Sequence, residues 1–393
     1  MFIDYFSNIE NIHSKDINIL IGANGSGKSE TLNILAKQYL ESNYNIIGIS
    51  NCTFDKFDIK HKNFNFIGMR NGSKIIESTI NNFLRKIYHD EIKLEFIEYC
   101  FHEIKLKPML GFEIIDYDEL NNLNFLDREK LHKLIKDLYT NKNWDFPISK
   151  EVPKTLENFF WFDFREKNIH TFKKTYDLYK IITKITSNNI YVFEDRFILP
   201  YPLYKASSGQ IHKLLNMLFI LAQYDINKKN IIIIDEPETS LHPHWQARYV
   251  EDLKIFISKL NSFFNYPYSF KLIVATHSPL IINYIKSKEN LRNQTNLLRV
   301  NKSKENGIIN LETINIHDDY SIESIYWEVF EVLTQENSFL SRYIVQLIHK
   351  FLDKSISKYS LLEQLQLLKS HSFDKVQKDA IDQSIIYATN LES

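Results

Sequence analysis

The glycine-rich stretch GANGSGKS at residues 22–29 has the residue types and spacing that hold phosphate. It fits the pattern G-x-x-x-x-G-K-[ST] and lies between the apolar run INILI (17–21) and the helix-like SETLNILAKQYL (29–40), the context that this pattern requires. Glycines let backbone N–H groups approach a phosphate, and the N-terminus of the following helix adds partial positive charge. We therefore expect nucleotide contacts from Gly22, Asn24, Gly25, Ser26, Gly27, Lys28, Ser29 and Glu30.

Two side chains at the end of this stretch have separate expected roles. The Lys28 ammonium can bridge the β- and γ-phosphates of a nucleoside triphosphate, and the Ser29 hydroxyl can ligate Mg²⁺. The sequence therefore predicts ATP and Mg²⁺ as the ligands of this loop.

A pair of carboxylates follows the apolar run IIII, at the end of the predicted strand NIIIID (230–235). Asp235 is placed to hold Mg²⁺, and Glu236 can polarise an attacking water molecule. Pro237 then ends the strand. A solvated strand end is the simpler alternative, but carboxylates at the ends of buried strands lie beside the cleft where α/β proteins bind ligands.

A histidine ends a second apolar run, KLIVAT at residues 271–276. His277 can hydrogen-bond a γ-phosphate from this position and respond to its loss. A single histidine is more often structural, but the strand-end position that it shares with Asp235 favours a functional role. Together with His242 and His244 it could suggest a zinc site, but the carboxylate partners expected of such a site are missing.

A second candidate anion site begins the long apolar helix of KASSGQIHKLLNMLFILAQY. Small hydroxyl-bearing residues at a helix N-terminus bind anions. Because residues 22–29 already hold the phosphates of one nucleotide, this helix would face the nucleotide of another protomer, which predicts an ATP-dependent homodimer. An ordinary serine N-cap is the alternative. The residues of this site are Ser207, Ser208, Gly209 and Gln210.

The order of elements predicts an α/β fold. Further strands are expected at residues 45–50, 64–69, 296–300 and 307–314. Residues from about 71 onward are rich in Lys and Glu with helical periodicity, strands return at NIYVFEDRFIL (189–199), and the pattern after residue 317 is helical. The expected divisions are an N-terminal core lobe (1–70), a helical insertion (71–188), a second part of the core (189–316) and a helical C-terminal region (317–393).

The composition indicates a globular protein of the cytoplasm. The 393 residues carry a net charge of −1, so no global field draws the chain to nucleic acid or to an anionic membrane. Cys52 and Cys100 lack metal-ligand spacing and fit reduced thiols. The N-terminus lacks the pattern of a signal peptide, and no apolar stretch is long enough to span a membrane.

The stretches GANGSGKS, ASSGQ, IIIIDEPETSLHP and THSP, in this order, resemble the Walker A, signature, Walker B with D-loop, and H-loop motifs of ABC-type ATPases. The last two are especially similar to RecF-like and SMC-like ATPases and to OLD-type AAA ATPases, including ATPase subunits of Septu, retron and PARIS anti-phage defence systems. The resemblance covers residues 1–70 and 189–316. It implies an ABC-type P-loop ATPase head whose two copies sandwich ATP.

The resemblance also implies roles for individual residues. Lys28 and Ser29 would be ligands of phosphate and Mg²⁺. Asp235 would be the metal-coordinating carboxylate, and Glu236 would be the catalytic base.

The remaining motifs imply a switch and a contact between protomers. His277 would be the γ-phosphate switch, Ser207 with Gly209 would contact the nucleotide of the partner, and residues 240–242 would form the D-loop. Two departures weaken a transporter hypothesis. Ser208 stands where a glycine is usual in transporters, and GMRNG (68–72) occupies the place of the Q-loop glutamine.

The sequence leaves two main functional hypotheses. Some OLD-type relatives carry a TOPRIM nuclease, which needs a strand-end glutamate and an Asp-x-Asp pair. After residue 317 we find Asp318-Asp319 in an expected loop and no Asp-x-Asp pair at a strand end, so we expect no nuclease in this chain and a separate effector, a nuclease or toxin. The main hypothesis is the ATPase sensor subunit of an anti-phage defence system, and the alternative is a RecF- or SMC-like factor for DNA repair or chromosome maintenance. FKKTYDLYKIITK (172–184) could meet DNA or be a solvated helix face, and an oligomer larger than a dimer stays open.

Overall fold

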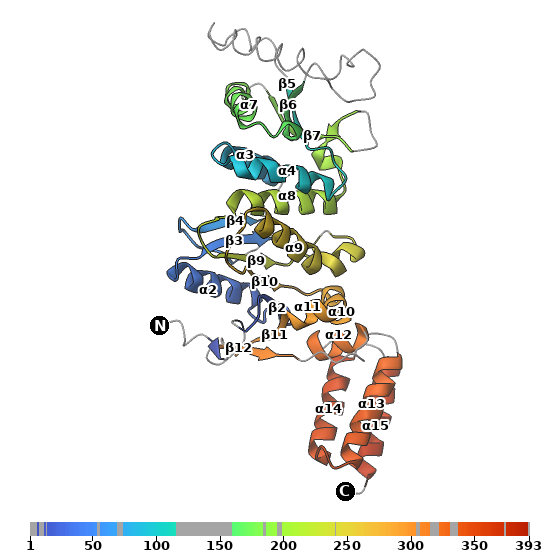
Figure 1. Cartoon of the computed structure of the whole chain (residues 1–393). Helices are drawn as coiled ribbons and strands as arrows, with labels where there is room; N and C mark the ends of the chain where they lie inside the picture. The colour runs from blue at the N-terminus through green and yellow to red at the C-terminus, as the bar shows by residue number, and fades with distance from the viewer. Residues whose placement is uncertain are drawn as a thin grey trace.

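The main structural element is an eight-stranded, largely parallel sheet (Figure 1). The computed structural model describes residues 6–7, 12, 14–52, 56–68, 74–114, 159–183, 186–194, 199–239, 241–303, 307–314, 322–330, 337–372 and 375–391. In spatial order the strands are β1 (Phe6–Ser7), β12 (Ile309–Thr313), β11 (Thr295–Lys302), β2 (Ile17–Ile21), β10 (Lys271–Ala275), β9 (Asn230–Asp235), β3 (Asn45–Ser50) and β4 (Phe64–Gly68). Neighbours from β11 to β4 run parallel, whereas β12 is antiparallel to β11.

Both faces of this sheet are covered, which explains why its central strands are continuous runs of isoleucine. Strands β2, β3 and β9 are buried along their whole length. Successive residues of β2 alternate between two cores, with Ile19 and Ile21 in one and Leu20 in the other. The helices that flank the sheet are α2 (Lys28–Glu41), α8 (Ser208–Gln223), α9 (Pro243–Phe263), α10 (Pro279–Ser287) and α11 (Glu289–Asn293). The prediction of an α/β P-loop fold is confirmed.

The segment predicted as a helical insertion contains helices and also most of a second sheet, which the sequence did not predict. Its helices are α3 (Ile75–Ile87), α4 (Glu91–His102) and α7 (Ile169–Ile182), with short turns η4 (Phe164–Glu166) and η5 (Leu203–Lys205). Its antiparallel strands, in spatial order, are β6 (Phe159–Asp163), β5 (Met109–Ile114), β7 (Thr186–Val192) and β8 (Tyr201–Pro202). Residues 189–192 of the run expected to belong to the core lie in β7 of this second sheet instead. Residues 115–158 of the predicted insertion lie outside the described residues.

Helix α8 joins the two layers of the molecule. It packs on the central sheet on one side and meets α3 and α4 of the insertion on the other (Figure 1). The N-terminus of α8 carries the predicted signature residues, so the insertion lies directly behind that candidate site.

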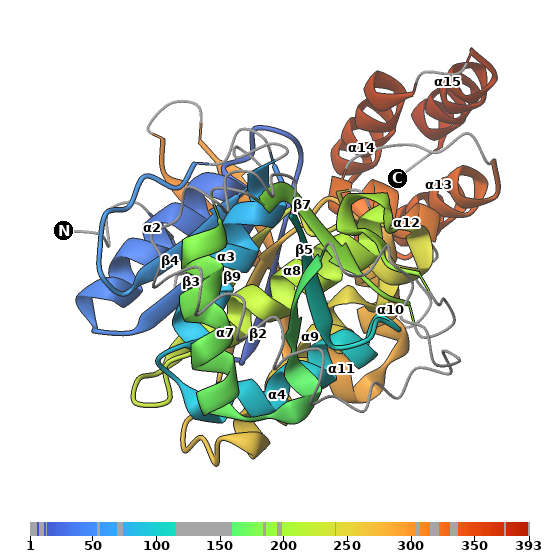
Figure 2. The same ribbon diagram turned by 90° about the horizontal axis from the view of Figure 1, so that it is seen from above.

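The C-terminal region is helical in its described parts, as predicted. Its helices are α12 (Ile322–Phe330), α13 (Asn337–Leu352), α14 (Lys358–His371) and α15 (Lys375–Asn390). Figures 1 and 2 show α13, α14 and α15 projecting from the rest of the chain as a bundle, and Figure 1 places it at the end opposite the insertion. No described helix has both the length and the apolar character needed to cross a membrane.

Helix α12 contributes to two separate cores. Ile325 is fully buried in the main core, and Phe330 packs against that core. Trp327, between them, belongs to the core of the C-terminal bundle together with Leu361 and Leu365. A displacement of the bundle therefore acts on a helix that is also anchored in the α/β domain.

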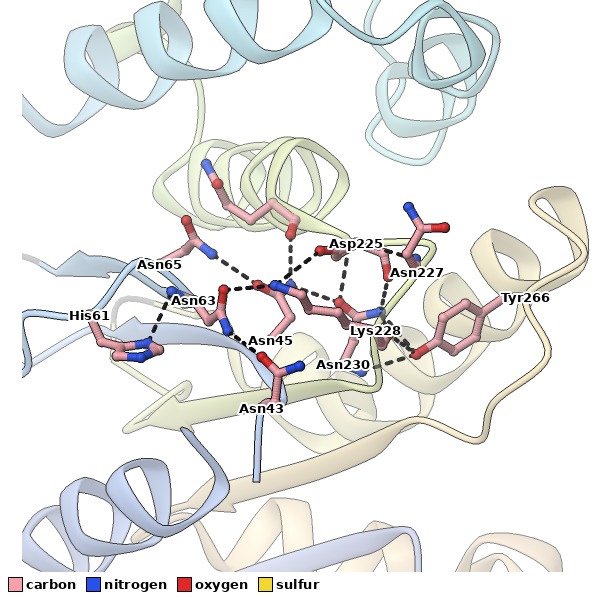
Figure 3. Close-up of polar contacts among 11 residues, drawn as sticks. Asn43, Asn45, His61, Asn63, Asn65, Asp225, Asn227, Lys228, Asn230 and Tyr266 are labelled. Atoms are coloured by element: carbon pink, nitrogen blue, oxygen red, sulfur yellow. Dashed lines mark hydrogen bonds and ion pairs between the residues drawn. The ribbon is translucent and has the colours of Figure 1, made fainter. Parts of the chain in front are cut away.

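A network of buried amides lies at the end of the sheet opposite the candidate site (Figure 3). The Asn45 amide donates to Asn230 Oδ1 at 2.8 Å, which links β3 to β9. The Tyr266 hydroxyl accepts hydrogen bonds from the backbone N–H and the side-chain amide of Asn230, both at 3.0 Å, and donates to the Lys228 carbonyl at 2.6 Å. The hydrogen-bonding capacity of this hydroxyl is thus fully used. Such a satisfied polar network fixes the register of the two strands.

Replacing Tyr266 by phenylalanine should therefore lower the stability of the chain. The change keeps the ring but leaves the buried backbone N–H of Asn230 without its acceptor and removes the donor to the Lys228 carbonyl, which costs about 1–3 kcal/mol of the free energy of unfolding. Denaturant unfolding of Tyr266→Phe measures this loss. The exposed neighbour Tyr268 provides the matched control, because Tyr268→Phe removes a hydroxyl from the surface. Equal stability of the two variants would contradict a structural role for the network.

Candidate functional site

The predicted phosphate loop has the backbone that its glycines permit. Gly22 has φ 151° and Gly27 has φ 100°, in a region where side chains are strained. A Cβ atom on Gly22 would also lie 2.7 Å from Ser26 Oγ and 2.8 Å from the Val300 carbonyl. Gly27 is the N-cap of α2, so the loop leads directly into the positive end of that helix.

Lys28 is buried in this loop and bound by it. Its ammonium donates to the carbonyls of Gly22 at 3.0 Å and Ala23 at 3.1 Å, and the residue is only 5% exposed. Burial lowers the pKa of Lys28 to about 8, although the negative charges of Glu236 and Asp235 oppose this shift. A phosphate bound in the loop would place a negative charge beside the ammonium and would so offset the cost of burying it.

Asp235 is the group of the site that most clearly fits a metal ion. It is fully buried, and neither carboxylate oxygen has a hydrogen-bond partner. Burial raises its pKa to about 6, and the nearby Ser29 hydroxyl only partly offsets this. An orphaned buried carboxylate beside a hydroxyl fits Mg²⁺, which prefers oxygen ligands and would supply positive charge there.

The strand ends place three predicted groups at one level. Ala275 of β10 pairs with Leu20 of β2 on one side and with Asp235 of β9 on the other. The three strands therefore end at the same edge of the sheet. The phosphate loop follows β2, His277 lies just after β10, and Glu236 follows β9. The structure thus places Lys28, Ser29, Asp235, Glu236 and His277 near one another at this edge.

Glu236 and His277 face each other across this edge. The distance between Glu236 Oε1 and His277 Nε2 is 3.6 Å. Burial, with a smaller contribution from the charge of Lys28, lowers the pKa of His277 to about 4. The imidazole is therefore neutral at pH 7, and the contact is not an ion pair. Glu236 has φ 52°, a left-handed conformation that is unfavourable for a glutamate.

Sequence reasoning missed the third carboxylate of this segment, Glu238. Its two oxygens accept hydrogen bonds from the Thr276 hydroxyl at 2.8 Å and from the His277 backbone N–H at 2.5 Å. Burial raises the pKa of Glu238. The only sequence signal was a third acidic residue directly after Asp235, Glu236 and proline, and its partners lie on another strand.

The predicted signature site differs in part from the expectation. Ser207 caps α8 and forms a capping box with Gln210, whose side chain also donates to the Ile104 carbonyl at 3.3 Å. Ser207 and Ser208 are exposed, but Gly209 is buried. A Cβ on Gly209 would lie 2.0 Å from the ring of Trp245, so close packing against that ring explains the glycine. Of the four predicted residues, the two serines are therefore the exposed ones.

Other predicted residues form an ion pair or a helix cap within the chain. Glu30 forms an ion pair with Lys302 at 2.7 Å beside the phosphate loop. His242 caps α9 and accepts a hydrogen bond from the His244 backbone. In the described parts of the chain, no three His, Cys, Asp or Glu side chains are arranged to hold a metal ion together, so the geometry gives the zinc alternative no support.

Some predicted positions lie outside the described residues. They are Ser240 of the expected D-loop, residues 69–72 at the expected Q-loop, and the pair Asp318-Asp319.

A comparison with known protein families finds a match over part of the chain. Residues 81–283, just over half of the chain, match the family described as "AAA domain, putative AbiEii toxin, Type IV TA system". The chain belongs to this AAA-domain family. The matched range includes the α8 N-terminus, Asp235, Glu236 and His277, and it begins after the phosphate loop.

This AAA-family chain is also similar to part of a characterised protein. It is 33% identical over 96 residues to Endonuclease GajA of Bacillus cereus (strain HuB5-5). The matched segment is 24% of this chain and 13% of GajA, so the chain corresponds to only a small part of that relative.

The buried charge of Asp235 should destabilise the metal-free protein. Because its pKa in the folded chain, about 6, lies above the ordinary 3.8, ionisation costs folding free energy as the pH rises from 4 to 6, and the cost persists above pH 6. With EDTA at pH 7.5, Asp235→Asn should therefore be about 1–3 kcal/mol more stable than wild type. Denaturant unfolding across pH measures this gain, which should shrink toward pH 4. Exposed Asp353→Asn is the control; an unaltered stability of Asp235→Asn would contradict the assignment.

The contact between Gly209 and Trp245 predicts a second stability effect. Gly209→Ala should lower the free energy of unfolding by about 1–3 kcal/mol, because the new methyl group collides with the indole ring. In a Trp245→Ala background the same change should be neutral or slightly stabilising, because alanine favours a helix more than glycine does. Thermal unfolding of the four chains tests this coupling, and purely additive effects would refute it.

Proposed function

We propose that the chain is an ATP-binding and ATP-hydrolysing dimerisation switch. The main supporting observation is that the ends of β2, β10 and β9 hold the Lys28 loop, His277 and Asp235 with Glu236 at one edge of the sheet. Membership of an AAA-domain family supports the same assignment.

In this proposal each residue has one task. The loop amides and Lys28 bind the phosphates, and Asp235 with Ser29 would hold Mg²⁺, which would neutralise phosphate charge. Glu236 accepts a proton from the attacking water, and neutral His277 can donate a hydrogen bond to the terminal phosphate. Because His277 carries no charge at pH 7, it reports the presence of that phosphate by a hydrogen bond and not by an ion pair.

The two-protomer arrangement is supported by the exposed end of α8. Ser207 and Ser208 lie at the surface at the N-terminus of a 16-residue helix, where hydroxyl groups and the helix dipole favour an anion. We propose that a second copy brings its nucleotide to these serines in the ATP state. Gly209 and Gln210 would act from behind, by allowing the approach of Trp245 and by completing the cap.

A link from the site to the C-terminal bundle supports a signalling role. The Phe330 ring of α12 lies 6.4 Å, centroid to centroid, from the His277 ring. Trp327 of the same helix packs with Tyr343 and His371 of the bundle. In our proposal a rearrangement at His277 reaches the bundle through α12, and the bundle passes it to a separate effector.

We propose that this switch is the sensor subunit of an anti-phage defence system in the cytoplasm, and that its effector is a separate nuclease or toxin. The similarity of its motifs to defence ATPases supports this task. The family description names a toxin of a toxin–antitoxin system, and the relative matched in part is an endonuclease.

The alternative, a RecF- or SMC-like DNA-repair ATPase, requires a surface for DNA. The stretch at residues 172–184 offers little for base stacking, because Tyr176 and Tyr179 are buried in the core. Lys180 lies over the rings of Tyr88 and Tyr176, 4.8 Å from each centroid. The exposed Lys174 of this stretch could still contact phosphates, so stimulation of ATP turnover by duplex DNA would favour the alternative.

Glu236→Gln should trap the ATP-bound dimer. The amide keeps the size of the side chain but cannot accept the proton, so turnover should fall by about 100-fold or more while nucleotide still binds. Light scattering with and without ATP and Mg²⁺ measures the mass. Lys28→Ala, which should lose nucleotide binding, is the control and should stay monomeric. A Glu236→Gln chain that is monomeric at saturating ATP would contradict the dimerisation switch.

A further inference from the structure

Glu238 connects the segment after β9 to the segment after β10. Its Oε1 accepts a hydrogen bond from the His277 backbone N–H at 2.5 Å, and its Oε2 accepts one from the Thr276 hydroxyl at 2.8 Å. Both oxygens of the carboxylate are thus directed at the loop that carries the histidine. Glu236 and His277 themselves approach only to 3.6 Å, so this direct contact does not fix their geometry.

A second set of hydrogen bonds closes a ring around this link. Gln246 of α9 donates to the carbonyls of Glu238 at 3.3 Å and Leu241 at 3.0 Å. The oxygen of the same Gln246 amide accepts from the Ser278 hydroxyl at 3.1 Å, and the Ser278 backbone N–H donates to Thr276 Oγ1 at 3.0 Å. Three segments of the chain therefore meet at Glu238.

Glu238 is half-buried, and the residues that it binds are more enclosed. Thr276 is fully buried and Ser278 is 4% exposed. Burial raises the pKa of Glu238 even though the hydrogen bonds from His277 and Thr276 favour its ionised form. A carboxylate in such a place costs more than a neutral side chain of similar size would, which suggests a role beyond packing.

The backbone of Glu236 needs external support. Its φ of 52° is unfavourable for a residue with a side chain, and such strain persists only where the surroundings hold it. The Glu236 N–H donates to the Ala275 carbonyl at 2.9 Å on one side. The carboxylate of Glu238, two residues later, provides the second attachment to the strand-end loop of β10.

We propose that Glu238 is a positioning residue, which holds the loop of His277 against the loop of Glu236 so that the base and the histidine keep one geometry through turnover. This inference rests on the proposed ATPase function. Glu238 acts through the His277 backbone and through residues 236–238, and it does not touch the reacting atoms.

Steady-state ATP hydrolysis by the full chain tests this role through a pair of substitutions. Glu238→Ala removes both acceptors, so kcat should fall by about tenfold or more while KM stays within about threefold of wild type. Glu238→Gln should retain most of kcat, because its oxygen still accepts from His277 and its amide can donate to the second lone pair of Thr276 Oγ1. Glu289→Ala, an exposed change on α11, is the control for loss of a glutamate.

A double-mutant cycle separates positioning from general stabilisation. If Glu238 acts through His277, then Glu238→Ala should have little further effect on kcat in a His277→Ala chain. Hydrogen exchange of the segment containing residue 277 adds a readout without nucleotide, and exchange there should accelerate in Glu238→Ala but not in Glu238→Gln. Should Glu238→Ala fail to fold, Thr276→Val, which removes one of the two donors, replaces it and should give a smaller fall in kcat.

The outcomes distinguish this inference from the function on which it rests. A wild-type chain with ATP turnover whose kcat is unchanged by Glu238→Ala, or whose two losses simply add in the cycle, would overturn the positioning role alone. A wild-type chain without ATP turnover would overturn the proposed function and the positioning role together.

Discussion

Two buried charges of opposite sign, Lys28 and Asp235, lie close together at the edge of the central sheet, and no hydrogen bond joins them. Lys28 is held by loop carbonyls, and both oxygens of Asp235 are without partners. Burial lowers the pKa of Lys28 and raises the pKa of Asp235, so it favours the neutral form of each group. A folded chain keeps such charges only where a ligand or another charge supplies the missing interactions. The parallel strands and the helix α2 can be understood as the frame that keeps these two groups in place.

The groups around Lys28 and Asp235 are connected to one another by hydrogen bonds and ring contacts. Glu238 connects the two strand-end loops, Gln246 connects them to α9, and Phe330 brings α12 next to the His277 ring. These contacts come from segments far apart in sequence, so a shift at one strand end cannot stay local. The insertion packs against α8, and the C-terminal bundle packs against α12. Both additions to the core therefore adjoin a helix that reaches the candidate site.

The sequence predicted what depends on local pattern. The glycine spacing of residues 22–29 and the isoleucine runs of β2 and β9 are sufficient to place the phosphate loop and the two carboxylates. It did not predict the second sheet, because β5 and β6 pair across a long separation and Gly111 is explained only by the Trp161 ring that packs on it. The same limit applies to Gly209 and Glu238, whose roles depend on Trp245 and on the loop of His277.

The left-handed backbone of Glu236 sets folding against chemistry at a single position. Glycine adopts this conformation without strain, and asparagine does so more readily than glutamate. The version of the chain that folds best at this position would therefore lack the carboxylate. A search for more thermostable variants would select against the proposed base there, so an increase in melting temperature caused by a change at residue 236 would be evidence of lost turnover and not of an improved enzyme.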